Sequence, residues 1–215
     1  MPLSSKRDVR AHGLILIHDV AVQGHRPLEP FDALLEHVRT FFGGHAVEVL
    51  HHDHGSIRTR VPAFHVLRVE PGPRLDLWTY VSAGVWEVTQ RDGHGLEFVV
   101  TTQRDEAAAV DLLTITAYYH AGPPEQRLDI GHTIPIGAPW LDDSACDHLL
   151  VSVPYPYGPD LEVCAWQRGH ARLLWLLPIT EAERDYRTTN GLEALEARFD
   201  EHAIEFWDPR RPSVV

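Results

Sequence analysis

The chain of 215 residues lacks the long hydrophobic runs that a membrane-spanning helix needs. No window approaches the roughly 18 consecutive apolar residues typical of such a helix. The first apolar run, residues 14–17, ends at a histidine and an aspartate and is too short for the core of a signal peptide. We therefore expect a cytoplasmic protein that does not interact with membranes.

Cysteine is also scarce, with only Cys146 and Cys164 in the whole sequence. A secreted domain of modest size that is held together by disulfides usually carries more. Two cysteines fit an intracellular compartment, and the sequence leaves open whether they pair with each other.

Basic residues are too few to suit a nucleic-acid partner. The 19 lysines and arginines stand against 31 acidic residues, which gives a formal net charge of -12. A surface of this sign repels a phosphate backbone, so we expect no binding to nucleic acid. The same charge favours a basic protein or peptide, such as a cationic toxin domain, as the partner. The sequence leaves the oligomeric state open.

The usual motifs of catalysis and nucleotide binding are absent too. The sequence contains no G-x-S-x-G elbow, no phosphate-binding loop and no dinucleotide fingerprint. Asp142 and Asp143 stand side by side in a loop near a proline, which is more typical of a solvated turn, or of a rim that meets a basic partner, than of an acid and base pair. We predict a non-enzymatic protein without a cofactor.

Histidine, in contrast, is abundant, with 15 in the chain. The tightest group is His51, His52, Asp53 and His54, which offers three imidazoles and a carboxylate to a metal ion. Adjacent residues of an extended chain point to opposite sides, so at most two of these side chains reach one ion. We interpret the group as a solvated loop and keep a metal site as the alternative. A metal-dependent enzyme, or an accessory protein of a biosynthetic cluster, is the corresponding alternative function.

Residues 75–102 contain the strongest structural pattern. Two arms rich in large apolar residues flank the polar, glycine-bearing connector 91–95, which predicts a β-hairpin. In the first arm, taken to include Val85 and Trp86, both alternating faces are apolar. We therefore expect a central hairpin with helices covering both sides of its sheet.

The remaining pattern predicts elements that can supply this cover. A helix should run from Pro30 to Gly43, and Asp105 should cap a second helix with Ala108, Leu112, Ile115 and Tyr119 on its buried stripe. Thr180 and Glu183 form the signature of a reciprocal helix cap, and a last helix should follow Asn190. Further strands are expected at residues 46–50, 63–69, 132–136, 148–153, 161–166 and 173–177. The predicted fold is a single α/β (α+β) domain over residues 28–215, with a mixed central sheet flanked by helices, after an N-terminal arm or edge strand in residues 1–27.

The order of several motifs resembles the suppressor of fused domain family. The similarity is carried by the segments WTYVSAGVWEV, GLEFVVTT, LLTITAYYH, DIGHTIP and LLWLLPITEAERDYRTTNGLEALEARF, followed by DPRRPSV. It extends from about Phe31 to the end of the chain and is similar to the single-domain bacterial type. The resemblance implies a mixed sheet with flanking helices and a non-enzymatic role in binding another protein or peptide. For single-domain members encoded beside toxins, it implies an immunity protein that neutralises its partner.

The resemblance also implies a binding site. In the family, a tyrosine at the end of a helix and an acid in the following strand contact an added peptide strand. Tyr118 or Tyr119 matches the tyrosine, whereas Gly131 stands at the position of the acid, so Asp129 would substitute for it, close to His132.

Two further groups complete the predicted partner-binding site. Trp140 and Trp207 fall outside the predicted helices and strands, which makes them candidates for exposed anchors. Asp142 and Asp143 would steer a basic partner toward the Trp140 loop.

Overall fold

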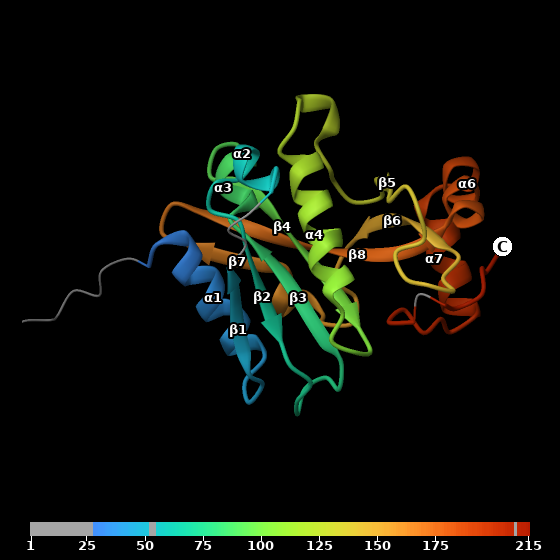
Figure 1. Ribbon diagram of the computed structural model, residues 1–215, viewed down its shortest axis with the longest axis horizontal. Coiled ribbons are helices and arrows are strands. Elements are labelled where there is room, and N and C mark those ends of the chain that lie inside the picture. The colour runs from blue at the N-terminus through green and yellow to red at the C-terminus, as the bar shows by residue number, and fades with distance from the viewer. Residues whose placement is uncertain (1–27, 52–54, 209) are drawn as a thin grey trace, which may run out of the picture.

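The computed structural model describes residues 28–51, 55–208 and 210–215. The predicted N-terminal arm or strand therefore lies outside the described residues. Within them, the strands form a single mixed sheet of eight strands, as predicted (Figure 1). Its strands follow one another in the spatial order β1 (Val47–His51), β2 (His65–Val69), β3 (Trp78–Ala83), β4 (His94–Thr102), β8 (Gly169–Thr180), β6 (Cys146–Ser152) and β5 (Thr133–Pro135).

The twelve-residue strand β8 joins the two halves of the sheet. It runs parallel to β4, whereas every other pairing in the sheet is antiparallel. On its opposite edge, β8 pairs first with β7 (Val163–Trp166) and further along with β6. The apolar run in β8 is buried on both faces because each face of the sheet is covered by helices.

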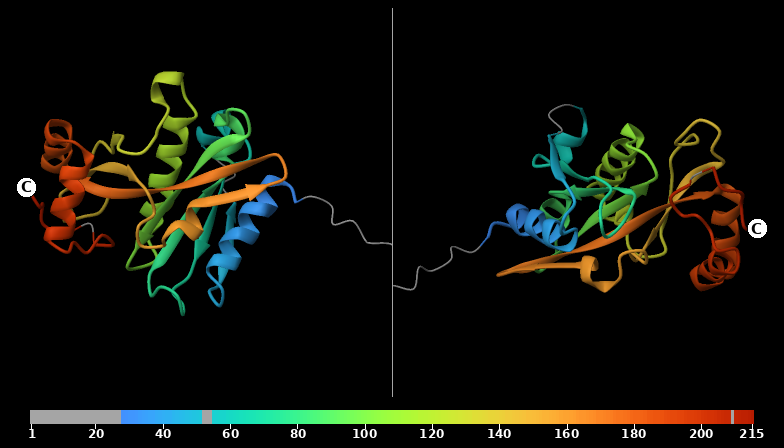
Figure 2. Two further views of the ribbon diagram at one scale, coloured as in Figure 1. Left: turned by 180° about the vertical axis from the view of Figure 1, so that it is seen from behind. Right: turned by 90° about the horizontal axis from the view of Figure 1, so that it is seen from below.

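Helices lie on both sides of the sheet (Figure 2). The described helices are α1 (Pro30–Phe41), α2 (Ile57–Arg60), α3 (Val85–Thr89), α4 (Ala107–His120), the 3-10 helix η1 (Pro124–Gln126), α5 (Pro159–Glu162), α6 (Glu181–Asn190) and α7 (Leu192–Glu201). Residues of α1, α5 and α7 share one buried cluster with one face of the sheet, and residues of α2 and α4 share a second cluster with the other face. None of the helices in the described part of the chain has both the length and the apolar character needed to cross a lipid bilayer.

The central hairpin has the predicted cover on both faces. Val81 and Tyr80, neighbours on β3, belong to opposite clusters and are each at most 1% exposed. The prediction that Val85 and Trp86 extend this strand is wrong, because the chain turns into the short helix α3 after Gly84, whose φ of 102° is unfavourable for other residues.

A buried carboxylate explains why the chain turns there. Glu97 on β4 is completely buried and accepts hydrogen bonds from the hydroxyl of Ser82 and from the backbone N–H groups of Gly84 (2.8 Å) and Trp86 (3.1 Å). Burial raises the pKa of Glu97 to about 7, although these hydrogen bonds act in the opposite direction. Glu97 thus fixes the start of α3 against the sheet.

Three smaller predictions need correction. Glu106, not Asp105, stands at the N-cap of α4, because the Asp105 carboxylate accepts hydrogen bonds from Tyr80 (2.6 Å) and Arg68 (2.7 Å) instead. The apolar stripe of α4 is also rotated, since Ile115 is 45% exposed. Its buried residues are Ala109, Leu112, Leu113, Thr116, Ala117 and His120. Residues 161–166, predicted as one strand, divide between α5 and β7.

The C-terminal segment closes the fold through one ion pair. The predicted reciprocal cap is present, because the Thr180 side chain accepts from the backbone N–H of Glu183 and the Glu183 carboxylate accepts from that of Thr180. The same carboxylate binds Arg211, which is 6% exposed, through both of its oxygens (2.6 and 2.9 Å). The final residues are thereby fastened to the start of α6.

Candidate functional site

The sheet ends at β5, whose outer edge pairs with no other described strand (Figure 1). On its inner side, the backbone bonds of Ile136 to Asp147 (2.8 Å) and of Val151 to His132 (2.9 Å) set the alternation of the ladder. The peptide groups of Thr133 and Pro135 therefore face outward. Proline carries no N–H, so the open edge offers one donor and two carbonyl acceptors over the strand.

Predicted contact residues lie directly before β5. Asp129 and His132 are exposed, and the backbone N–H of Asp129 donates to Nδ1 of His132 (3.3 Å). Gly131 between them has a φ of 82°, and a Cβ at this position would lie 3.0 Å from the guanidinium of Arg187. An aspartate at position 131 would thus be strained, which leaves Asp129 as the nearest acid at this end of the edge.

The two predicted tyrosines lie in the last turn of α4 and are half-buried. The guanidinium of Arg60 stacks over the Tyr118 ring at 3.8 Å and donates to the Tyr118 carbonyl (2.7 Å). This contact fixes Tyr118 against α2. Tyr119 packs at the margin of the core cluster beneath α4.

Asp129 also lines a hollow of about 620 Å³ together with His120 and Arg127. His120 is buried, and desolvation and then the charge of Arg127 lower its pKa to about 4, so its ring is neutral at pH 7. Its Nδ1 accepts from the backbone N–H of Leu128 (2.8 Å), which ties the connection after α4 to the helix.

Beyond the other end of β5 lies the loop with the second predicted group. Asp142 and Asp143 are exposed, as predicted, and Asp143 has a φ of 63°. The expectation that Trp140 is an exposed anchor is wrong, because the indole is 9% exposed and packs in the core cluster with α4. Its ring supports the loop that presents the two aspartates. Trp207 does lie outside the described helices and strands and is half-buried.

The histidine and cysteine predictions have different outcomes. His51 ends β1 and is exposed, whereas His52, Asp53 and His54 lie outside the described residues. In the described ranges, no group of three or more histidine, cysteine or acidic side chains is arranged to hold a metal ion. Both cysteines are free thiols buried in different clusters, on opposite faces of the sheet.

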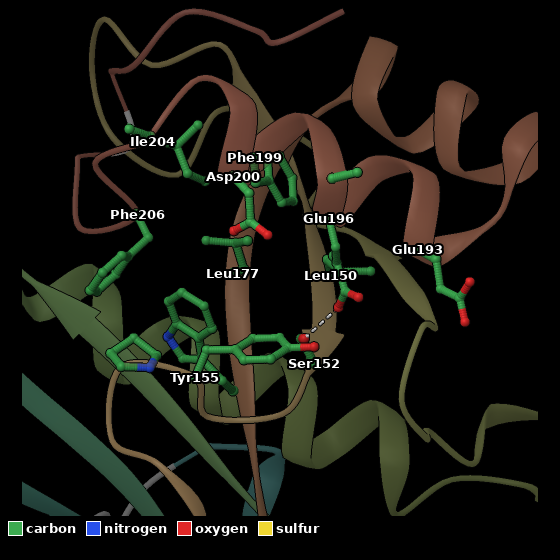
Figure 3. A pocket seen from close by; sticks show the side chains of 14 residues that line it. Leu150, Ser152, Tyr155, Leu177, Glu193, Glu196, Phe199, Asp200, Ile204 and Phe206 are labelled. Atoms are coloured by element: carbon green, nitrogen blue, oxygen red, sulfur yellow. Dashed lines mark hydrogen bonds between the residues drawn. The ribbon is translucent and has the colours of Figure 1, made fainter.

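A second hollow, which the sequence analysis did not predict, lies between α7 and the sheet (Figure 3). Its volume is about 670 Å³. Three acids of α7, Glu193, Glu196 and Asp200, line it together with the ring of Tyr155. Their spacing along the helix places them on one side, which was the signal available in the sequence.

These features define a class of protein: an α+β domain whose mixed sheet is covered on both faces and ends in a short open edge between polar loops. The sequence model of the suppressor of fused protein family matches residues 60–212. A crystal structure of a suppressor of fused homologue from Neisseria gonorrhoeae superposes with a TM-score of 0.75 at 33% identity, over 86% of this chain and 97% of that one. The chain belongs to the suppressor of fused family.

More distant structures share the fold. A chain in a crystal structure of the Sufu–Fu complex matches with a TM-score of 0.68 at 14% identity, over 88% of this chain and 93% of the other. Drosophila Suppressor of Fused matches with a TM-score of 0.59, also at 14% identity, over 87% of this chain and 52% of its own length. No curated protein has a sequence that matches this one.

Proposed function

We propose that this protein is a non-enzymatic binding protein that holds a partner protein along the open edge of β5. The observation that carries the proposal is the position of this edge between two exposed acidic sites. Asp129 lies before the strand, and Asp142 and Asp143 lie after it. An extended partner segment would add a strand to β5 and meet negative charge at both ends.

The short strand restricts what the edge can bind. Thr133 supplies the outward N–H, and the carbonyls of Thr133 and Pro135 supply the acceptors. Proline at an edge also suppresses uncontrolled pairing between copies of a sheet. Binding through backbone contacts alone would therefore be weak, and side-chain contacts around Tyr119 and the two acidic sites supply the specificity.

The partner proposed here is a basic toxin domain that the protein neutralises as an immunity protein. Two facts support this choice: the net charge of -12 and the exposure of the acids that flank the edge. A related fold occurs in the Sufu–Fu complex, in which the Sufu protein is bound to another protein. Burial of the toxin's active surface against this domain would be the mechanism of inhibition.

The test is co-purification of the full chain with the product of the adjacent gene, followed by binding kinetics on variants of the edge. Thr133→Pro removes the outward N–H and leaves the bonds to β6 in place, so it should weaken binding about tenfold or more. Asp142→Asn with Asp143→Asn should slow association and reduce its salt dependence, and asparagine still tolerates the positive φ at position 143.

The matched control for the charge change is Asp111→Asn, an exposed acid on α4. It should leave the association rate within about twofold of the wild-type value. A complex that forms equally well with Thr133→Pro and with the double asparagine variant would refute binding at this edge.

A further inference from the structure

The hollow beneath α7 combines an apolar floor with a purely acidic rim. Its floor consists of Leu150 from β6 and of Trp175 and Leu177 from β8. Around this floor stand Glu193, Glu196 and Asp200 of α7. No lysine, arginine or histidine occurs among the 14 described residues that line the hollow, so its negative charge has no counterion there.

Two of the acids are directed into the hollow, as Figure 3 shows for Glu196 and Asp200. Glu196 accepts a hydrogen bond from the hydroxyl of Ser152 (3.3 Å). Burial raises the pKa of Glu196, hydrogen bonds from Ser152 and Tyr155 act in the opposite direction, and the neighbouring charges of Asp200 and Glu193 add to the rise. A cation placed between these carboxylates would relieve the repulsion between them.

Aromatic rings complete the site. Tyr155 crosses the lower side of the hollow in Figure 3 and is 62% exposed, an unusual value for a large aromatic side chain. At the left of the hollow in Figure 3, Phe206 packs edge-on against Trp175 at 5.0 Å and against Trp207 at 4.6 Å. Ring faces and carboxylates together are the groups that bind a guanidinium or ammonium ion in proteins.

The volume limits the size of an occupant. About 670 Å³ exceeds what a single guanidinium fills and falls in the range of pockets that hold a small ligand or a few side chains. The apolar floor suits the methylene stem of a long side chain and an adjoining apolar residue. The acids on α7 would receive the charged end.

We propose that this hollow is a second contact site, which accepts an arginine or lysine side chain of the partner protein with its apolar neighbour. The inference rests on the proposed partner-binding function, because it names a group that the partner presents. The hollow lies on the α7 face of β6, the strand that pairs with β5, so one partner can occupy the edge and the hollow together.

A peptide titration of the isotope-labelled full chain, followed by NMR, tests the site without the natural partner. The probe is acetyl-Gly-Leu-Arg-Gly-amide, and its matched control carries citrulline, which has the shape of arginine without the charge. The arginine peptide should shift the resonances of Tyr155, Trp175 and Phe199 in a saturable way. The citrulline peptide should bind at least tenfold more weakly.

Two sets of variants locate the binding. Glu196→Gln with Asp200→Asn should weaken binding of the arginine peptide at least tenfold without lowering the melting temperature, because the change removes repulsion between acids. Glu87→Gln with Asp111→Asn removes the same charge from exposed positions outside the hollow and should leave the affinity unchanged.

Three results would overturn the proposal: equal binding of the arginine and citrulline peptides, unchanged affinity in the Glu196 and Asp200 variant, or tighter binding of free agmatine than of the arginine peptide. The last result would indicate a site for small amines. Thr133→Pro should not affect peptide binding, so failure at the hollow and failure at the β5 edge remain distinguishable.

Discussion

Replacement of Arg211 by alanine should destabilise the fold more than any other change to the C-terminal segment. Arg211 is 6% exposed, and its partner Glu183 is completely buried. Both carboxylate oxygens of Glu183 contact the guanidinium, which also donates to the carbonyl of Pro178 (3.2 Å). The variant would leave a carboxylate in the interior without its cation.

The magnitude follows from the remaining contacts. Without arginine, Glu183 keeps only the hydrogen bonds from the backbone N–H groups of Thr180 (3.0 Å) and Val214 (3.1 Å). Loss of one partner of a buried ion pair typically costs about 3–5 kcal/mol. Because a domain of this kind has a total stability of about 5–15 kcal/mol, the loss should be visible as a large shift of the unfolding midpoint.

Urea unfolding of the full chain measures this effect, with Arg210→Ala as the matched control. Arg210 is exposed and adjacent in sequence, and its replacement should change the free energy of unfolding by less than about 0.5 kcal/mol. The double variant Arg211→Met with Glu183→Leu should recover part of the loss, since it removes the unpaired charge. A loss below about 1 kcal/mol in Arg211→Ala would refute the view that this pair closes the fold.

Three further predictions concern the sheet and its helices. Because the pKa of Glu97 is raised to about 7 from an ordinary 4.5, its contribution to stability is greatest below pH 4.5 and decreases as the pH rises through 7. Relative to Glu97→Gln, the wild type should therefore lose about 3 kcal/mol of its free energy of unfolding between pH 4.5 and pH 8, as measured by urea unfolding. A difference between the two proteins that stays constant with pH would contradict this. Gly84→Ala should lower the free energy of unfolding by at least about 1 kcal/mol more than Gly137→Ala. Both glycines have a positive φ, but of the two only a Cβ at position 84 would meet a backbone oxygen, at 2.5 Å. Equal losses of stability in thermal unfolding would contradict the steric argument. Cys146 and Cys164 are buried, and burial raises the pKa of each thiol. Both should therefore react with a thiol reagent only after unfolding. Rapid labelling of either cysteine in the native protein would contradict this prediction.

The sequence predicted the architecture where the signal was local. The helix after Pro30 and the cap formed by Thr180 and Glu183 depend on neighbouring residues, and both are present in the structure. The covered hairpin could be predicted because large apolar side chains occur on both faces of the arm that contains β3. The family resemblance rested on the order of such segments, and the family is confirmed.

The errors arose where distant residues decide the local structure. Aspartate is a residue type that favours helix N-caps, but the carboxylate of Asp105 accepts hydrogen bonds from Tyr80 and Arg68 instead. Trp140 lies in a loop and was expected on the surface, yet a large ring is readily buried by a core that forms beneath the loop.

The candidate site was only partly visible in the sequence. Asp129 was found through the family resemblance, and Asp142 and Asp143 as polar residues of a loop after a predicted strand. The sequence does not indicate that this strand is the last in the sheet. The hollow beneath α7 requires Leu150 and Tyr155 to lie beside a helix that is far along the chain. Such proximity depends on the packed fold and not on a local motif.

The affinity of the purified product of the adjacent gene for the wild-type chain, compared with its affinity for Thr133→Pro, decides whether the β5 edge is the binding site. We expect the wild-type chain to bind the product of the adjacent gene and the proline variant to bind it at least tenfold more weakly, with an unchanged melting temperature. Equal affinities for a complex that does form, or purification of the wild-type chain without that partner, would contradict the proposal that the β5 edge neutralises a toxin.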